Sequence, residues 1–448
     1  MHRTSLMWFS HDLRLDDNPV LHMAANSDAL VCVFFVEPEW FQPIATSQQS
    51  GPRIGRHRWR FLHQSLEDLN QQLKALGQRL LLVYESPAKA LPGLIHRFSV
   101  NRVCRSLHAT AHEQRQWQQL TERYSDIEWL QLSSYDLFQS QQLPFDNAQL
   151  PSSFSKFRKL IEQIPCPTPL AAPPCLPLSP LDSDTIRQAS AAIPSVPLQP
   201  MPSDELRRLV GGEGRAQQHL KQYFNSAKPS SYKQVRNELD GWHHSTKLSS
   251  WLANGCLSVR RVIAALKRYE QEVEANDSTY WIYFELLWRE YFHCYAKHHG
   301  AKLFQFKGLG ETRPLTSFYP QRFRQWSAGK TQFPLVNACI NQLNATGYLS
   351  NRGRQIVASC LVNELQLDWR YGAAYFEYQL IDYDVAVNWG NWQYIAGVGA
   401  DPKGGRHFNI EKQTQIFDPD GDYIQRWQGQ QSAAPLDSVD CADWPNWQ

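Results

Sequence analysis

A cluster of prolines constrains the fold of this chain more than any other feature. Eleven of the 27 prolines fall within 38 positions, from Pro165 to Pro202. Proline fixes φ and lacks a backbone N–H, so we expect that such a stretch cannot sustain a helix or a central strand. We therefore predict an extended connector laid over the surface, and two domains within the 448 residues.

The part of the chain before the connector has the pattern of an α/β domain. Large apolar residues that recur every three or four positions predict a helix over Arg56–Leu76, closed by Gly77. Apolar runs suited to buried parallel strands lie at Leu6–Phe9, Leu30–Val36, Leu80–Tyr84, Arg102–Cys104 and Ile127–Leu132. Such alternation favours a doubly wound parallel sheet. No GxGxxG sequence accompanies it, which argues against a nicotinamide dinucleotide site.

The part after the connector has an all-helical pattern. Helical spacing of apolar residues is found over Glu205–Phe224, Ser258–Glu274, Thr279–His298, Phe333–Asn344, Asn351–Glu364 and Tyr371–Tyr383. We predict an α/β domain over residues 1–132, an interdomain linker over 133–203, an all-α domain over 204–428 and a loose tail over 429–448.

Composition excludes several classes of function. The net charge of +2 removes any argument for bulk electrostatic binding to nucleic acid, so such binding needs a local patch. The nine cysteines are odd in number and never spaced as CxxC, which favours reduced thiols and gives no zinc signature. We expect no metal, and surface positions for His57, His298 and His299. No apolar run reaches membrane-spanning length, and no leader pattern opens the chain, so we expect a soluble cytoplasmic protein.

One segment, Thr346–Gly399, gathers the side chains that chemistry needs. Its side chains include two carboxylates two residues apart, two neighbouring guanidinium groups, two amides and three indoles: Asp382, Asp384, Arg352, Arg354, Asn351, Asn388, Trp369, Trp389 and Trp392. Buried carboxylates demand partners, and the guanidinium fork suits them best. We interpret this segment as the wall of a site.

Two motifs earlier in the helical part suit phosphate. Ser245–Ser249 surrounds Lys247 with hydroxyls just before an apolar run, and hydroxyls and amides at a helix start hold phosphate oxygens. An ordinary capping segment explains this motif equally well. Tyr232 and Arg236 lie four residues apart on one helical face, where both can contact a phosphate.

A third motif suits a base. Glu285 and Trp288 share a helical face, with Arg289 beside them. A carboxylate next to an indole can hydrogen-bond a base edge while the ring stacks on the base. Taken alone, an amphipathic helix with a Glu–Arg surface pair is the commoner explanation.

These motifs, in their order and spacing, resemble the photolyase and cryptochrome family. The similarity rests on YKQVRN, HSTKLSSWLANGCLS, FELLWREYF, TGYLSNRGRQIVAS, DWRYGAAYFEYQLIDYDVAVNWGNWQY and AGVGADPKGGRHFNIEKQ, and on WFSHDLRLDDNPVL near the N-terminus. It therefore spans the chain. Within the family the DASH cryptochromes match best, through SNRGRQ, Tyr394 after GNW, and the GxDPxxxRxFNI pattern.

The resemblance implies a bound FAD. By similarity, its phosphates and ribitol would contact Tyr232, Ser245, Thr246, Lys247, Leu248 and Ser249. Arg354 and Asp382 would form a salt bridge against the flavin ring, with Asn351 and Arg289 nearby. Asp384 would accept from the ring amide, and Asn388 would face the flavin N5. The flavin would carry the redox chemistry and the protein would orient it.

The resemblance also implies a substrate, a cyclobutane pyrimidine dimer turned out of a DNA strand. Glu285 would hydrogen-bond the dimer, with Trp288 and Tyr394 flanking it. Further contacts to bases or phosphates would come from Asn351, Arg352, Gln355 and Arg236. Excited reduced FAD would lend the dimer an electron that later returns. Since Tyr394 replaces a larger tryptophan, less ring surface offsets lost stacking, and we expect a preference for single-stranded DNA.

A tryptophan chain that reduces the flavin under light is a further implication. Trp392 and Trp369 match its two inner members. Its outer member is missing, since Thr316 and Phe318 stand where relatives carry tryptophan. Trp326, Trp389 and Tyr319 are open as substitutes, and for any single tryptophan a role in core packing is the commoner one.

Similar proteins carry 5,10-methenyltetrahydrofolate as an antenna between their domains. Glu113 matches an acidic contact to its pterin, and a solvent-facing helix glutamate is an equal alternative. We expect a monomer whose chief partner is single-stranded DNA with pyrimidine dimers, and RNA as a second. Two other functions stay open: a blue-light signalling cryptochrome, and a nucleic-acid-binding flavoprotein regulator that does not repair.

Overall fold

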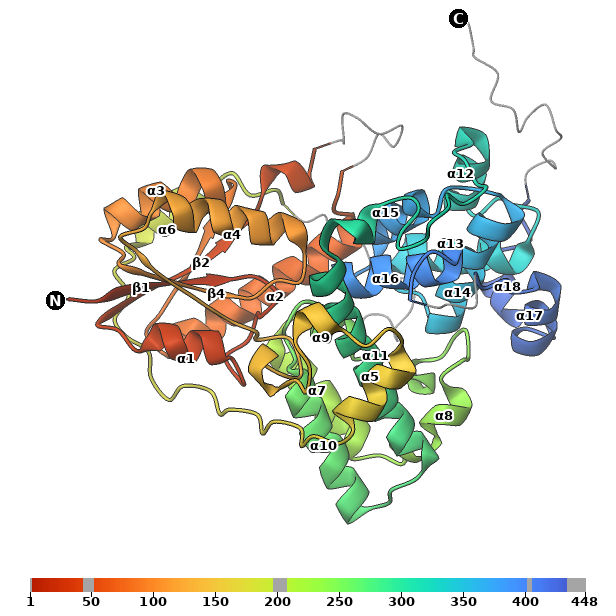
Figure 1. Cartoon of the computed structure of the whole chain (residues 1–448), viewed down its shortest axis with the longest axis horizontal. Coiled ribbons are helices and arrows are strands. Elements are labelled where there is room, and N and C mark those ends of the chain that lie inside the picture. Colours follow the sequence, from red (N-terminus) through yellow and green to blue (C-terminus); the bar gives the residue numbers. More distant parts are fainter. Residues whose placement is uncertain (1, 43–51, 196–207, 401–404, 433–448) are drawn as a thin grey trace, which may run out of the picture.

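The N-terminal part is built on a five-stranded parallel sheet (Figure 1). The computed structural model describes residues 2–42, 52–195, 208–400 and 405–432. The strands are β1 (Thr4–Phe9), β2 (Ala29–Phe35), β3 (Leu80–Val83), β4 (Arg102–Ser106) and β5 (Glu128–Leu132), in the order β3-β2-β1-β4-β5. All five expected strands are confirmed. The strand order reverses between β1 and β4, which creates a crevice at their carboxyl ends.

Both faces of the sheet are covered, which explains why its strands are continuously apolar. Met7 and Phe9 of β1 pack with α1 (Pro19–Ala25) and α2 (Arg56–Ala75), while Leu6 and Trp8 face α3 (Pro87–Arg97) and α4 (Ala111–Arg123) (Figure 1). The expected helix over Arg56–Leu76 is confirmed as α2. His57 in this helix is 5% exposed, so its expected surface position is wrong. Its ring contacts the carbonyl oxygen of Asn344 at 3.2 Å.

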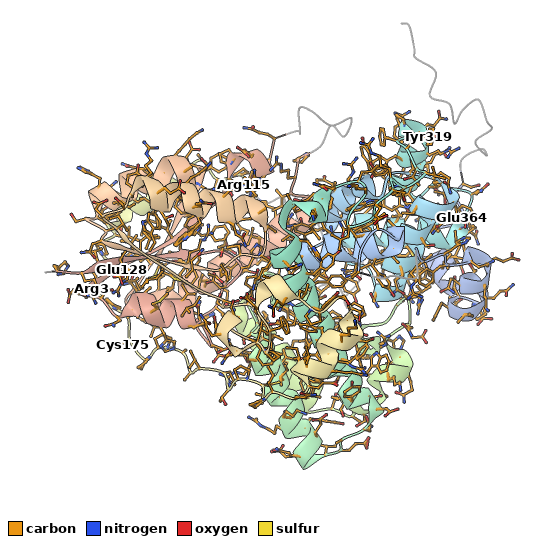
Figure 2. All side chains as sticks on the ribbon, viewed as in Figure 1. Arg3, Arg115, Glu128, Cys175, Tyr319 and Glu364 are labelled. Atoms are coloured by element: carbon orange, nitrogen blue, oxygen red, sulfur yellow. The ribbon has the colours of Figure 1, made fainter. Side chains whose placement is uncertain are left out.

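The connector follows the surface of the α/β part and is fastened to it. Leu170 exchanges hydrogen bonds with Asp17, and Leu178 forms an isolated bridge with Ala29. Figure 2 shows the exposed Cys175 of this segment at the margin of the molecule. The expectation that this segment contains no helix is wrong. A short helix, α6 (Ser183–Ser190), interrupts it, because residues 181–193 contain no proline. Another short helix, α5 (Phe154–Ile161), precedes the proline cluster.

The C-terminal part is helical. Its helices are α7 (Glu213–Phe224), α8 (Tyr232–Val235), α9 (Ser249–Ala253), α10 (Val259–Glu272), α11 (Asp277–His299), α12 (Pro320–Ser327), α13 (Pro334–Thr346), α14 (Asn351–Ser359), α15 (Trp369–Gln379), α16 (Val385–Ala396), α17 (Ile410–Phe417) and α18 (Asp422–Arg426). Within the described residues, no helix is both long and apolar enough to cross a membrane, and the eight cysteines are unpaired.

Three helix boundaries differ from the predictions. The helix expected from Glu205 begins at Glu213, because Gly212 takes a φ of 111° just before it. Residues 360–364 form a π-turn after α14. The helix expected to reach Tyr383 ends at Gln379, which frees the following loop to enter the site. The tail expected to be loose lies mostly outside the described residues, and the domain boundaries stay predictions.

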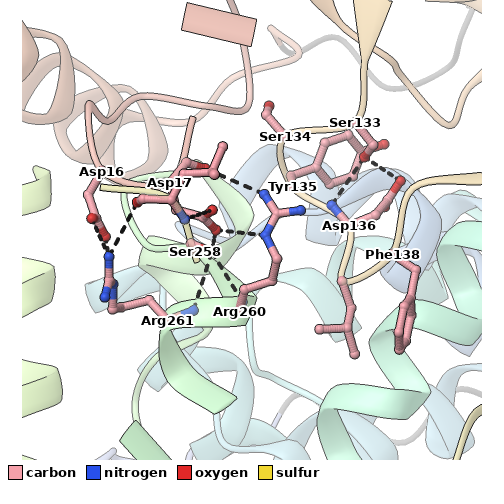
Figure 3. A network of polar contacts seen from close by, with 12 residues as sticks. Asp16, Asp17, Ser133, Ser134, Tyr135, Asp136, Phe138, Ser258, Arg260 and Arg261 are labelled. Carbon is pink, nitrogen blue, oxygen red and sulfur yellow. Dashed lines mark hydrogen bonds and ion pairs between the residues drawn. The ribbon is translucent and has the colours of Figure 1, made fainter. Parts of the chain in front are cut away.

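Buried charges lock the two parts together (Figure 3). Asp17, in the loop after β1, pairs with Arg260 of α10 at 2.8 Å, and Asp16 pairs with Arg261. The fully buried Arg14 donates to the carbonyl oxygens of Asp17 and Gly255. A side chain at position 255 would meet the His11 carbonyl oxygen at 2.0 Å, so the loop and the helical part are in direct contact.

Candidate functional site

Two adjoining cavities lie in the helical part and share one wall. The first is lined by the segment before α9, by α8 and by α14, through residues that include Tyr232, Ser245, Thr246, Lys247, Leu248 and Ser249. The second is lined by α14 and α16, through Gln355, Asp384, Asn388, Trp392 and Tyr394. Asn351, Arg354 and Asp382 belong to both. The structure thus brings the two ends of the predicted site to opposite sides of one shared wall.

The shared wall is an ion pair. The Arg354 Nη2 atom lies 2.9 and 2.7 Å from the two carboxylate oxygens of Asp382. The Asp382 side chain is 2% exposed, and the Arg354 side chain is 26% exposed. Arg354 is further fixed by donation to the Leu349 carbonyl oxygen at 2.9 Å. This arrangement offers a flat, partly dry surface of opposite charges against which a planar ring can lie.

A residue with a strained backbone, Lys247, lies at the polar end of the first cavity. Lys247 has a φ of 54°, which a residue with a side chain seldom adopts. Its Nζ donates to the Tyr348 hydroxyl at 2.9 Å and lies over that ring. The hydroxyl groups of Ser245 and Thr246 line the same space. Hydroxyls with a buried ammonium group are donors for an anion such as a phosphate.

The second cavity is lined by an amide and a carboxylate that hydrogen bonds to neighbouring groups hold in place. Asn388 is buried and donates to the Ala373 carbonyl oxygen at 3.0 Å. Asp384 caps α16 by accepting from the Val387 N–H, and it also accepts from the His293 ring. Gln355 brings a buried side-chain oxygen that has no partner. Such an oxygen awaits a donor, which a ligand in this cavity can supply.

Glu285 lines the first cavity, and Trp288, one turn further along α11, lines neither of the two cavities. Glu285 pairs with Arg236 and accepts from the Trp281 indole at 3.1 Å. Burial raises the pKa of Glu285, and Arg236 partly opposes that rise. The Trp288 ring lies 6.2 Å from the Tyr394 ring. This geometry brings a carboxylate and two aromatic rings to one place.

Phe154 is a residue that the sequence analysis missed. It comes from α5 and stacks on Trp288 with ring centroids 3.7 Å apart and an interplanar angle of 13°. No local pattern identifies it, since Phe154 and Trp288 are 134 positions apart in the sequence. The linker therefore contributes to the surroundings of the expected substrate.

Two predicted residues point away from the cavities. Arg289 donates to the Tyr135 carbonyl oxygen at 2.8 Å. Arg352 donates to Asn237 and lies over the rings of Phe408 and Phe417. Neither lines the two cavities, so each would act on a ligand through a neighbour or after a rearrangement.

The four tryptophans considered for light-driven reduction of the flavin form two pairs. The Trp392 ring, which lines the second cavity, lies 6.5 Å from that of Trp326, and the Trp369 ring lies 5.8 Å from that of Trp389. Trp326 in turn lies 5.4 Å from Tyr375. All four indoles are buried. Phe318 stacks on Tyr371 at 3.9 Å, and Tyr319 lies at the outer end of α12 (Figure 2).

A third cavity, between the α/β part and the helical part, opens at the crevice where the strand order reverses. It is lined by the ends of β1, β2 and β4 and by Tyr383, which also lines the second cavity. Glu113 contributes a buried carboxylate oxygen without a partner, and the Arg105 Nε atom is unpartnered too. Burial, with Glu39 and Glu113 nearby, raises the pKa of Glu37 to about 7. A ligand with N–H donors would satisfy the Glu113 and Glu37 carboxyl groups, and an acceptor on the same ligand would satisfy the Arg105 Nε–H.

One cluster in the described residues has the spacing of metal ligands. Asp136, Glu290 and His293 bring their ligand atoms within 4.8 Å of one another. The Lys297 ammonium already pairs with Asp136, and Glu290 accepts from the Leu137 and Phe138 N–H groups. These donors satisfy the carboxylates, so the cluster is a network of ion pairs.

Known proteins are similar to this chain in sequence and in fold. Residues 281–444 match the FAD binding domain of DNA photolyase, and residues 5–175 match DNA photolyase. The chain is 49% identical to cryptochrome DASH of Vibrio parahaemolyticus over 99% of its own length and 97% of that protein. A Synechocystis cryptochrome structure superposes with a TM-score of 0.87 at 36% identity, over 99% of this chain and 92% of that one. A class III photolyase from Agrobacterium tumefaciens gives 0.77 at 26% identity, over 95% and 86%.

Proposed function

The chain belongs to the photolyase and cryptochrome family, among its DASH cryptochromes, and on this premise we propose that it repairs cyclobutane pyrimidine dimers in single-stranded DNA under blue light. One observation carries the proposal: the two adjoining cavities place phosphate donors at one end and a carboxylate, an amide and an indole at the other. A bent FAD matches that sequence of groups.

The residues present fit FAD. Tyr232 and the Ser245–Ser249 segment, which includes Lys247, would hold its phosphates and ribitol. The Arg354–Asp382 pair would support the flavin ring. Asp384 is ready to accept from a ring N–H, and the orphan oxygen of Gln355 needs a donor. When bound, FAD supplies the electron that light makes available. The protein holds the ring, excludes water and keeps the neighbouring charges balanced.

The substrate would lie near Glu285. Its carboxyl group would hydrogen-bond the dimer, with Trp288 and Tyr394 as flanking rings. Arg236, which now neutralises Glu285, would turn to a phosphate when the dimer arrives. Extruding a dimer from a duplex costs roughly a few kcal/mol, and a single strand avoids most of that cost.

A repair assay tests the proposal directly. Purified protein should carry a flavin absorption band and, under blue light, should remove dimers from a single-stranded oligonucleotide faster than from the matching duplex. Darkness and an undamaged strand serve as controls. A flavin-loaded protein that leaves the dimers intact in light would contradict repair and favour a signalling or regulatory role. Equal rates on both substrates would contradict the single-strand preference alone.

We also propose methenyltetrahydrofolate as an antenna in the third cavity. Glu113 and Glu37 offer carboxylates to its pterin N–H groups, and Arg105 is near. When the folate is added to the purified protein, its absorption band should appear in the excitation spectrum of flavin fluorescence. The band should be lost when Glu113 is replaced. We further propose that the protein is a cytoplasmic monomer and that RNA is its second partner. The mass of the protein in solution is the first measurement that checks this.

A further inference from the structure

Four charged side chains form a row from the second cavity into the joint between the two parts of the chain. Asp384 accepts from the His293 Nε2 at 2.7 Å, and Asp136 accepts from the His293 Nδ1 at 2.7 Å. Asp136 also pairs with the Lys297 Nζ. His293 and Lys297 lie one turn apart on α11. Asp136 lies in the segment after β5, where Figure 3 labels it. The row thus links the linker to the cavity wall.

The geometry fixes the protonation of His293. A neutral imidazole has one N–H and one lone pair, so it can donate to only one of two carboxylates. Here both ring nitrogens face carboxylate oxygens at 2.7 Å, and the side chain is fully buried. Only the imidazolium satisfies both contacts. Burial alone would lower the pKa of His293, yet Asp384 and Asp136 outweigh it and leave that pKa above its ordinary value.

The other groups around His293 agree with a balanced row. Arg289 lies close enough to Asp384 and His293 to affect both charges, and the Tyr135 ring lies 4.8 Å from the imidazole. Glu290 is occupied by backbone N–H groups. Burial would raise the pKa of Asp384, but His293 holds it well below its ordinary range. Asp384 is therefore an anion in the lining of the second cavity.

We propose that His293 is a positioning residue that holds Asp384 as a fixed, anionic hydrogen-bond acceptor for a planar ligand ring with N–H donors in the second cavity. This inference rests on the proposed FAD binding and adds a residue that does not line the cavity itself. The buried Asp136 lies at one end of the imidazole, and Asp384 at the other end lines the second cavity, so the row ends at a carboxylate next to the space that a ligand would occupy.

The first test needs no ligand. Histidine labelled with ¹⁵N in the flavin-free protein should show both His293 ring nitrogens protonated at pH 7.5. In Asp384→Asn, where Nε2 loses its anionic partner, the ring should lose a proton at a lower pH than in the wild type. A singly protonated His293 in the wild-type protein would overturn the proposal, whether or not the protein takes up FAD.

The second test uses FAD. His293→Gln removes the positive charge, and His293→Arg retains it. We expect the FAD dissociation constant to rise tenfold to hundredfold, roughly, in His293→Gln, since a charge-assisted hydrogen bond is lost. A roughly tenfold change in preference between oxidised and reduced FAD would appear as a shift of about 30 mV in its two-electron potential. His293→Arg should retain more affinity than His293→Gln.

His22→Gln is the matched control, because that ring makes a 2.7 Å contact on the exposed side of α1. A His293→Gln protein with wild-type affinity and potential would refute the positioning role. Should His293→Gln not fold, the nitrogen protonation in the wild type and in Asp384→Asn still decides. A wild-type protein that binds no FAD would refute the proposed function and would leave the first test intact.

Discussion

Replacing Arg354 by methionine should expose how much the shared wall of the two cavities contributes to stability. The substitution leaves Asp382, whose side chain is 2% exposed, without the cation that lies 2.7 Å away. Breaking a fully buried pair costs about 3–5 kcal/mol. Because solvent reaches a quarter of Arg354, we expect about 2–3 kcal/mol in the flavin-free protein.

A double-mutant cycle separates this pair from its surroundings. Asp382→Asn should cost less than Arg354→Met, because the remaining guanidinium keeps water and the Leu349 carbonyl oxygen as partners. The double variant should lie at least ~1 kcal/mol closer to wild type than the sum of the single changes. Urea unfolding followed by helical circular dichroism measures all three.

Arg370→Met is the matched control. Arg370 pairs with Asp368 at the same 2.7 Å, but its side chain is 41% exposed. That change should cost less than ~1 kcal/mol. If the Arg354 and Asp382 changes add without coupling, or if Arg370→Met costs as much as Arg354→Met, burial does not govern the strength of this pair and the reasoning fails.

Other predictions concern the remaining sites. At pH 8, Glu37→Gln should raise the free energy of unfolding by about 2–3 kcal/mol. The pKa of Glu37 is about 7 in the folded protein and 4.5 when free, so the folded protein loses stability as the pH rises between these values. Urea unfolding at pH 4.5 should show no difference between the variant and the wild type. Trp392→Phe should slow light-driven reduction of bound FAD by an external thiol, and Trp326→Phe should slow it more than Tyr319→Phe, measured by flavin absorption. Glu285→Gln should weaken binding of a dimer-bearing strand roughly tenfold or more, measured by fluorescence anisotropy.

Local patterns predicted the fold well where a single segment determines its own environment. The five strands are buried on both faces, so their apolar runs are visible in the sequence. Helix α6 was missed because prolines on both sides concealed a short proline-free stretch. The cavity residues on α14 and α16 were predicted by their chemistry and by the resemblance, and the structure brings most of them together.

Residues whose role depends on distant partners were not predictable from local patterns. Phe154 gains its role from Trp288, and His293 gains its charge from Asp136, each over more than a hundred positions of sequence. Arg352 is a similar case. Its residue type fits a phosphate contact, which stays a prediction, and its position over the rings of Phe408 and Phe417 could not be read from the sequence.

The charged joint between the two parts has an optical consequence. An excited pigment hands its energy to a second pigment with an efficiency that falls steeply with their separation and depends on their mutual orientation. Asp17, Arg260 and Arg14 fasten the loop after β1 to the helical part through buried contacts, so two chromophores bound on opposite sides of Tyr383 would be held at one distance and one angle. Light gathered in one compartment would then reach the other with a constant yield.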